Sequence, residues 1–250
     1  MTIEAGMGFG SGTADKYYDR LDVRSFGEST PLYRGMVGRL VGTGATAEPH
    51  SPFHLPEPPT IVLGGFHSPD SLHEADGFIT EIAHGHPYSL VAVDRNSAPI
   101  QRLTDVAPHV RALQGNLQTL DIGGKPVDMV LLDFTLNFMS PEEMNAFFAH
   151  MKTLLSQNGL VIAAVDTATT IRGMFTGHVQ RKCFDGVPRH EYTERVLVEN
   201  ARKAGLKCVM LVEWRVSRSL CISGLAFSRL DSSFKEDSDT RIFPELNPIS

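Results

Sequence analysis

Two glycines and an aspartate, each placed directly after a short apolar run, are the first residues in this chain suited to hold a ligand. Gly64 and Gly65 end the run 60–63, and Asp94 ends the run 90–93. Glycines after a strand let the backbone pass close beneath a ligand. A carboxylate at the end of the next strand can accept hydrogen bonds from both ribose hydroxyls. This layout predicts a nucleoside-binding unit of strand, turn, helix, strand and acid.

The glycine turn lacks the later glycines of a dinucleotide-binding motif, and the residues that follow it limit which cofactor can bind. Phe66 and His67 stand where a G-x-G-x-x-G motif would continue, and the chain has no P-loop motif. The Phe66 ring would crowd a pyrophosphate but could face a cation. Arg95, next to Asp94, keeps a 2′-phosphate as an open alternative. A plain strand-to-helix turn and a solvated helix-capping acid are the structural alternatives at these positions.

Polar and aromatic residues also follow the next two predicted strands. Asn116 is suited to meet an adenine amine and Leu117 to pack on the ring, although an Asn in a turn is common. Asp133, with Asn137 nearby, offers acceptors for an amine. The aromatic rings of Phe134 and Phe138 offer π faces to a positive centre. Asp166, at the end of the fifth predicted strand, is a further acid. Core packing of both phenylalanines is the alternative.

Seven apolar runs predict the strands that position these residues: 60–64, 89–94, 110–114, 127–133, 160–166, 208–216 and 221–228. The first five have the composition of buried parallel strands, and the last two indicate an antiparallel hairpin. Helices are expected after Ser68-Pro69, from the capping box that begins at Ser140 as far as Asn158-Gly159, and from Glu194. We therefore predict an α/β fold with a doubly wound, seven-stranded, mostly parallel sheet.

Bulk composition excludes several classes of function. The 250 residues carry a net charge of −6 without a basic stripe, so no nucleic-acid partner is expected. Three cysteines without CxxC spacing, and a lone H-x-H at 84–86, predict no metal site and no disulfide framework, which suits the cytoplasm. No apolar run approaches the roughly 20 residues that span a bilayer, and no signal peptide is expected.

Three segments divide the chain. Residues 1–59 are predicted to be a helical N-terminal lid, in which Tyr18 could close over a ligand, followed by a Pro-rich linker. Residues 60–230 form the predicted core, and residues 231–250 a polar tail. The oligomeric state stays open, with a homodimer as one option.

The order of these strands and motifs resembles that of the class I S-adenosylmethionine-dependent methyltransferases, over roughly residues 60–228. The resemblance rests on the run 61–65, on Asp94, on residues 115–117 and on the run from 127 through 162. It implies S-adenosylmethionine as cofactor, bound by Gly64, Gly65, Phe66, His67, Asp94, Arg95, Asn116, Leu117, Asp133, Phe134 and Phe138. Residues 132–139 also resemble carboxy-S-adenosylmethionine synthases. An acid in the first strand and a G-x-G are missing, so the first motif is altered.

Three functions remain in competition. The favoured one is methyl transfer to a small molecule, with Asn137, Asp166 and Tyr18 as catalytic candidates. In the second, the cofactor is itself the substrate: its amine attacks the γ-carbon, giving azetidine-2-carboxylate and methylthioadenosine. The third is an NAD(P)-binding reductase or regulator, although the Tyr-x-x-x-Lys pair of short-chain reductases is absent. The residues do not identify a methyl acceptor.

Overall fold

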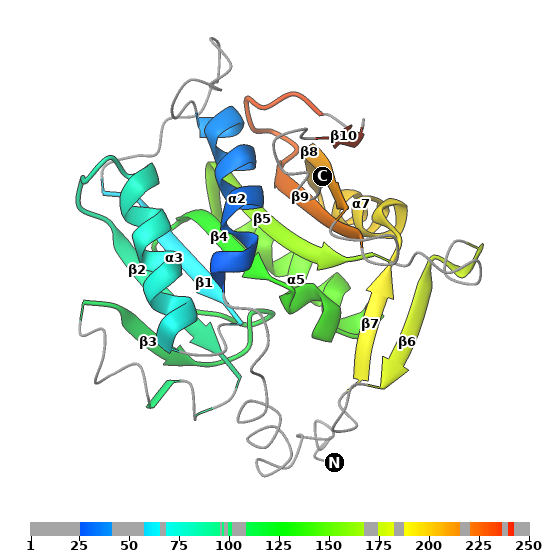
Figure 1. The fold of residues 1–250 in the computed structure, drawn as a ribbon, viewed down its shortest axis with the longest axis horizontal. Helices are drawn as coiled ribbons and strands as arrows, with labels where there is room; N and C mark the ends of the chain where they lie inside the picture. Colours follow the sequence, from blue (N-terminus) through cyan, green and yellow to red (C-terminus); the bar gives the residue numbers. More distant parts are fainter. Residues whose placement is uncertain are drawn as a thin grey trace.

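Short buried runs of aliphatic residues build one central sheet (Figure 1). The computed structural model describes residues 26–41, 58–65, 69–95, 97, 100–101, 109–167, 175–182, 188–215, 221–236 and 240–242. The sheet has eight strands in the order β10-β8-β9-β5-β4-β1-β2-β3. Their bounds are β1 Thr60–Gly64, β2 Ser89–Asp94, β3 Arg111–Gln114, β4 Val127–Asp133, β5 Leu155–Asp166, β8 Leu206–Arg215, β9 Cys221–Arg229 and β10 Thr240–Ile242.

The predicted α/β fold is confirmed. Strands β1 to β5 are mutually parallel, and β9 runs antiparallel between β5 and β8. The strand order reverses between β1 and β4, where Gly64 pairs with Leu132 beside the end of β4. The carboxyl ends of β1, β2 and β4 therefore meet at one edge, where ligands of doubly wound sheets bind.

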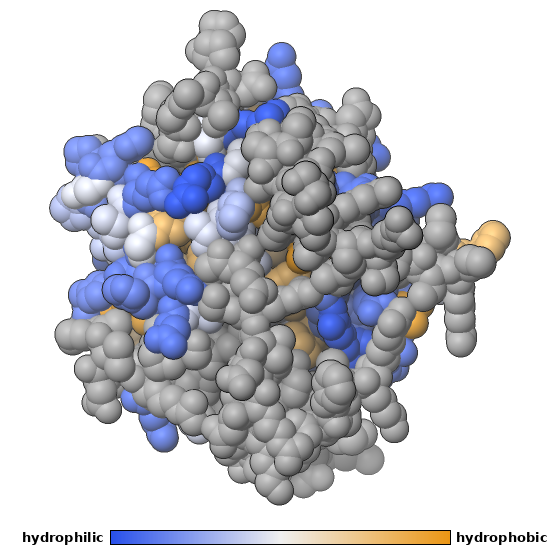
Figure 2. All heavy atoms as spheres, viewed as in Figure 1, coloured by the Kyte–Doolittle hydropathy of each residue, from blue (hydrophilic) through white to orange (hydrophobic). Residues whose placement is uncertain are grey.

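Helices of the described part of the chain cover both faces of the sheet (Figure 1). Helices α2 (Phe26–Val41) and α3 (Pro69–Ile82) share one apolar cluster with the sheet, while α5 (Pro141–Leu154) and α7 (Glu194–Lys203) share the other. In the view of Figure 2 the described surface around α3 is mainly hydrophilic, with apolar residues visible only between polar ones. This is the pattern of amphipathic helices packed on a buried sheet.

Helix α2 belongs to the segment predicted as an N-terminal lid, but it is packed into the core. Its residues Leu32, Tyr33, Met36 and Val37 are fully buried. The helix contacts α3 and the strands β5, β8 and β9. Because so much apolar surface is buried there, α2 is part of the core. Tyr18, the residue expected to close over a ligand, lies outside the described residues.

The capping box of α5 forms as predicted, but the helix is shorter than expected. The Ser140 side chain accepts a hydrogen bond from the Glu143 backbone, and the Glu143 side chain accepts one from the Ser140 backbone. Leu155 has an extended backbone, with φ −66° and ψ 140°, and pairs with Val127. The helix therefore ends at Leu154, ahead of the predicted Asn158-Gly159, because strand pairing takes over.

Three strands were not predicted. β6 (His178–Lys182) and β7 (Pro188–Tyr192) form a separate two-stranded antiparallel sheet. β10 lies in the segment expected to be a polar tail and pairs in parallel with β8. These strands contain few apolar residues, so neither alternation nor a buried run marks them in the sequence.

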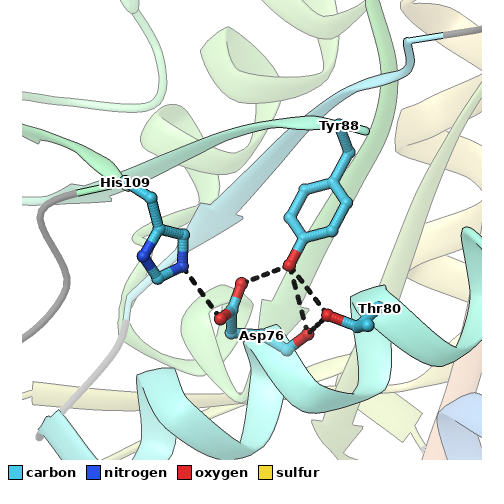
Figure 3. Close-up of polar contacts among 4 residues, drawn as sticks. All are labelled: Asp76, Thr80, Tyr88 and His109. Atoms are coloured by element: carbon cyan, nitrogen blue, oxygen red, sulfur yellow. Dashed lines mark hydrogen bonds and ion pairs between the residues drawn. The ribbon is translucent and has the colours of Figure 1, made fainter. Parts of the chain in front are cut away.

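A hydrogen-bonded network ties α3 to the amino ends of β2 and β3 (Figure 3). The Tyr88 hydroxyl donates to Asp76 Oδ1 at 2.6 Å, and His109 Nε2 lies 2.9 Å from Asp76 Oδ2. Thr80 Oγ1 is 2.9 Å from the Tyr88 hydroxyl oxygen. Tyr88 directly precedes β2 and His109 precedes β3, so this network lies at the edge opposite the predicted ligand-binding residues.

No helix within the described ranges is long and apolar enough to cross a membrane.

Candidate functional site

A pocket opens at the carboxyl edge of the sheet, beside the point where the strand order reverses. Its walls come from the ends of β1, β2 and β3 and from the 3₁₀ helix η1 (Thr135–Phe138) after β4. Ten residues line it: Gly65, Val93, Asp94, Arg95, Gly115, Asn116, Leu117, Thr135, Phe138 and Met139. Six of the predicted cofactor-binding residues are among them, which brings segments from distant parts of the chain to one cavity.

The glycine turn is tight for a reason that the sequence does not reveal. Gly65 has a left-handed backbone with φ 72°, and an added Cβ would lie 2.2 Å from Thr135 Oγ1. The Thr135 hydroxyl donates to the Gly64 carbonyl at 2.7 Å. A Cβ on Gly64 would lie 2.7 Å from the side chain of Leu117. The space beside both glycines is therefore filled by the protein itself, whereas we expected a ligand there.

Asp94 and Arg95 stand at the end of β2 in different environments. Asp94 is buried, with 4% of its surface exposed, and it lines the pocket. Arg95 is exposed and forms an ion pair with Glu143 at 2.9 Å. Because Glu143 also caps α5, this ion pair connects the end of β2 to the first turn of α5 beside the pocket.

Asn116 and Leu117 lie at the end of β3 as predicted. The Asn116 carboxamide oxygen accepts a hydrogen bond from the backbone of Gln118 at 3.1 Å, which shapes the turn. This is the Asx turn that was the structural alternative for Asn116. Leu117 is buried, and its side chain reaches Gly64, so it packs between β1 and the pocket.

Asp133 and Phe134 do not line the pocket. The hydroxyl of Tyr33, on α2, donates to Asp133 Oδ1 at 3.0 Å and to the Leu132 carbonyl at 2.9 Å. Burial, followed by the charge of Asp133, raises the pKa of Tyr33 well above its ordinary value, so the phenol stays protonated. Phe134 has a left-handed backbone with φ 52° and packs in the apolar cluster of α2 and α3.

Asn137 and Asp166 are brought together by hydrogen bonds that connect η1 to the end of β5 and to β7. The Asn137 carboxamide donates to the carbonyls of Asp166 and His190, at 2.9 and 2.8 Å, and accepts from the Asp166 backbone at 2.9 Å. The Asp166 carboxylate forms an ion pair with Arg189 of β7. Neither residue lines the pocket, so their catalytic roles stay predictions, and the geometry gives both a positioning role.

The β6–β7 hairpin carries a cluster of rings beside the pocket wall. His178 Nε2 lies 2.9 Å from His190 Nδ1, and the ring of Tyr192 stacks on His178 with centroids 4.8 Å apart. The Tyr192 hydroxyl donates at 2.7 Å to the carbonyl of Met139, which lines the pocket. Sequence reasoning missed both histidines, because nothing near them in the chain marks a site.

Burial decides the protonation of this cluster. It lowers the pKa of both His178 and His190 below the ordinary imidazole value, and the nearby glutamates act in the opposite direction. Burial raises the pKa of Tyr192, and the charges of Glu142 and Glu143 add to that effect. At neutral pH the cluster therefore consists of two neutral imidazoles and a protonated phenol.

Other lining residues were also missed, and some predicted ones cannot be placed. Thr135 and Met139 line the pocket although neither type marks a site in a sequence. Phe66, His67 and Tyr18 lie outside the described residues. Among the residues that the structure does describe, no group of three or more His, Cys, Asp or Glu side chains is placed to hold a metal ion.

The pocket lies beside the strand-order reversal of the sheet, which is where doubly wound α/β proteins bind nucleoside ligands. A family model described as a methyltransferase domain matches residues 75–163. The match covers less than half of the 250 residues, so it is a similarity over that segment of the chain. No curated protein sequence matches the chain.

Solved structures share the fold at low sequence identity. The 1,6-didemethyltoxoflavin N1-methyltransferase of Burkholderia thailandensis, bound to 1,6-didemethyltoxoflavin and S-adenosylhomocysteine, has a TM-score of 0.59 and 16% identity, with 88% of this chain and 84% of that one covered. A methyltransferase of Leishmania major has a TM-score of 0.61 and 10% identity, with coverages of 87% and 82%. The N-methyltransferase NodS of Bradyrhizobium japonicum has a TM-score of 0.54 and 13% identity, with 84% of this chain and 90% of that one covered.

The comparisons do not support every expected resemblance. None of the proteins named here is a carboxy-S-adenosylmethionine synthase, so the local resemblance of residues 132–139 to those enzymes gains no support.

Proposed function

We propose that the chain transfers a methyl group from S-adenosylmethionine to a small molecule. The observation that carries this proposal is the pocket in which Gly65, Asp94 and Asn116 converge at the carboxyl edge of the sheet. When bound, S-adenosylmethionine supplies a methyl group on a sulfonium, an already activated leaving group. The protein mainly has to hold the donor, orient the acceptor and exclude water.

The lining residues are suited to hold the adenosine part of the donor. Asp94 is a buried carboxylate at the end of β2, where it can accept hydrogen bonds from two ribose hydroxyls. Leu117 and Phe138 supply apolar surface for the adenine ring, and Arg95 is held by Glu143 at the rim. The acceptor would then lie beyond Phe138 and Met139, toward the β6–β7 hairpin.

Relatives with the same fold support a small acceptor. The Burkholderia enzyme binds the small molecule 1,6-didemethyltoxoflavin, and this chain covers 84% of its length. The net charge of −6 also favours a small molecule over a nucleic acid.

The test begins with S-adenosylhomocysteine, titrated into the full chain by calorimetry. Asp94→Ala should weaken binding by about tenfold or more, because a ribose hydrogen bond to a charged group contributes about 1.5–3 kcal/mol. Asp231→Asn is the matched control, since Asp231 is exposed and follows β9 at the opposite edge of the sheet. Unchanged binding in Asp94→Ala would contradict the ribose placement.

The same preparation separates the competing functions. Incubation with S-adenosylmethionine alone should leave it intact over the time of a methylation assay. Stoichiometric methylthioadenosine without an added acceptor would instead identify the cofactor-consuming cyclase. Binding of NAD(P) without binding of S-adenosylhomocysteine would identify the reductase or regulator.

A further inference from the structure

The β6–β7 hairpin is fastened to the same short segment that forms one wall of the pocket. Asn137 donates to the His190 carbonyl at 2.8 Å, and Tyr192 donates to the Met139 carbonyl at 2.7 Å. Phe138, between those two residues, lines the pocket. An isolated bridge between Thr167 and Tyr192 joins the hairpin to the end of β5. The hairpin and the pocket therefore share η1 as a common wall.

His178 and His190 form a hydrogen-bonded pair on this hairpin. Their ring planes are within 11° of each other, and Nε2 of His178 lies 2.9 Å from Nδ1 of His190. A single hydrogen sits between two neutral imidazoles in such a contact. It follows that one of the two outer nitrogens, Nδ1 of His178 or Nε2 of His190, carries a hydrogen and the other is a free acceptor.

The outer nitrogens are available to a ligand or to water. Within the described part of the chain neither has a hydrogen-bond partner, and neither is among the fully buried polar atoms. The two residues differ in depth: His190 is only 5% exposed, whereas His178 is half-buried. His190 is thus the inner member of the pair and His178 the outer one.

Charged groups around the pair suit it to receive a proton transiently. Burial lowers the pKa of both imidazoles, and Glu142 acts on both in the opposite direction. Glu143 adds to that effect at His190, while His178 opposes the protonation of His190. On the β5 side, Asp166 and Arg189 are ion-paired, and Tyr192 stays protonated. The pair is therefore neutral before the reaction, and the charges of Glu142 and Glu143 favour the imidazolium that forms when a proton is received.

We propose that the His178–His190 pair is the proton acceptor of the methyl transfer, and that the methyl acceptor is a neutral N–H or O–H compound bound between the hairpin and Phe138. This inference rests on the proposed function and deepens it by naming the class of acceptor. The pair has an imidazole nitrogen without a partner among the described residues, and its hairpin is hydrogen-bonded to the pocket wall.

The proton balance of the reaction gives such a group a role. The acceptor's nitrogen or oxygen lone pair forms a bond to the methyl carbon, the carbon–sulfur bond breaks, and its electron pair stays on sulfur as a neutral thioether. The methylated acceptor is left as a cation and releases its proton to the free imidazole nitrogen. The hydrogen bond between the rings then lets a proton leave from the other outer nitrogen to solvent.

The first test needs no acceptor. In the full chain labelled with ¹⁵N-histidine, NMR should show one shared N–H···N contact and a coupled titration of His178 and His190 below the ordinary value of about 6.5. His84→Asn serves as the control, because His84 is exposed and has a φ of 51°, which asparagine tolerates. Two imidazoles that titrate independently near 6.5 would overturn the relay.

The second test measures methylation of a panel of small amines, N–H heterocycles and phenols, with carboxylates and thiolates as acceptors that have no proton to lose. In His190→Asn, transfer to the neutral acceptors should fall about 10²–10⁴-fold. Transfer to the anionic acceptors should be unchanged, as should binding of S-adenosylhomocysteine. His178→Asn, at the half-buried position, repeats the comparison if His190→Asn does not fold.

Each result separates the two proposals. If the parent chain does not bind S-adenosylhomocysteine, the proposed function itself is wrong. Intact binding with no methylation of any N–H or O–H compound would overturn only the acceptor class. Equal losses for neutral and anionic acceptors would show a structural role for the pair, which also overturns the relay.

Discussion

Thr135 determines what the residue at position 65 can be. Its hydroxyl occupies the place that a Cβ on Gly65 would take, while it donates to the carbonyl of Gly64. The positive φ of Gly65 adds a backbone reason for glycine. The turn after β1 is therefore fixed by packing against η1, before any ligand is considered.

Two glycine-to-alanine changes should have opposite signs. Gly65→Ala should lower the free energy of unfolding by about 1–3 kcal/mol, because the methyl group meets Thr135 and the backbone is strained. Gly77→Ala, in the middle of α3 with no atom within 4 Å of the new Cβ, should raise it by about 0.4–1 kcal/mol. Urea denaturation of both variants measures the difference; equal effects would show that the space at Gly65 is not limiting.

At the scale of elements, α2 holds the end of β4 from the opposite side of the sheet. Tyr33 stacks on Phe26 with centroids 4.9 Å apart and carries its hydroxyl to the end of β4. Since Thr135 and Phe138 follow directly on the chain, the position of η1 depends on this contact. The N-terminal helix thus contributes to the pocket without lining it.

Tyr33→Phe isolates this contribution. The variant keeps the ring and its stacking but removes the donor to Asp133 and Leu132, so it should cost about 1–3 kcal/mol of stability. Thermal unfolding measures the loss. Tyr88→Phe is a suitable companion, because Tyr88 also donates to an aspartate but is exposed enough for water to replace the bond. A smaller loss in Tyr33→Phe than in Tyr88→Phe would contradict the buried linkage.

Strong local patterns made the main elements predictable. The buried apolar runs matched β1, β2 and β4 at both ends, and the Ser140 capping box placed the start of α5. The β6–β7 hairpin was missed because its pairing joins polar segments such as His178–Lys182 and Pro188–Tyr192, whose positions depend on tertiary contacts.

The site was predictable where a residue's role follows from its place at a strand end. Asp94 and Asn116 line the pocket for that reason. The contacts of Asn137 could not be predicted, because its side chain is directed by the backbones of Asp166 and His190, which are far away in the sequence. The hydrogen bond of Asp133 could not be predicted either, because its donor Tyr33 stands a hundred residues earlier in the chain.

At the scale of the whole molecule, the histidine pair should make stability depend on pH. Folding lowers the pKa of His178 and His190, so below about pH 6.5 the unfolded chain binds protons that the folded chain resists. Stability should therefore fall as the pH drops from that value toward the lowered pKa. Glu194, whose pKa is raised chiefly by burial, acts in the opposite direction.

A difference measurement separates these contributions. Urea denaturation near pH 7.5 and near pH 5.5 should show a larger loss of stability on acidification in the parent chain than in the double variant His178→Asn, His190→Asn. His84→Asn should behave like the parent. An identical loss in the double variant would show that the pair does not resist protonation.

We expect the short strand β10, which pairs with β8 at the border of the sheet, to limit self-association. β8 would otherwise present a row of unpaired backbone groups at the border of the sheet, and residues 240–242 pair with its segment 211–213. An unpaired border strand is a template for a second chain. Removing residues 237–250 should therefore leave the pocket and the binding of S-adenosylhomocysteine intact while light scattering detects concentration-dependent association, a liability that this three-residue strand keeps in check.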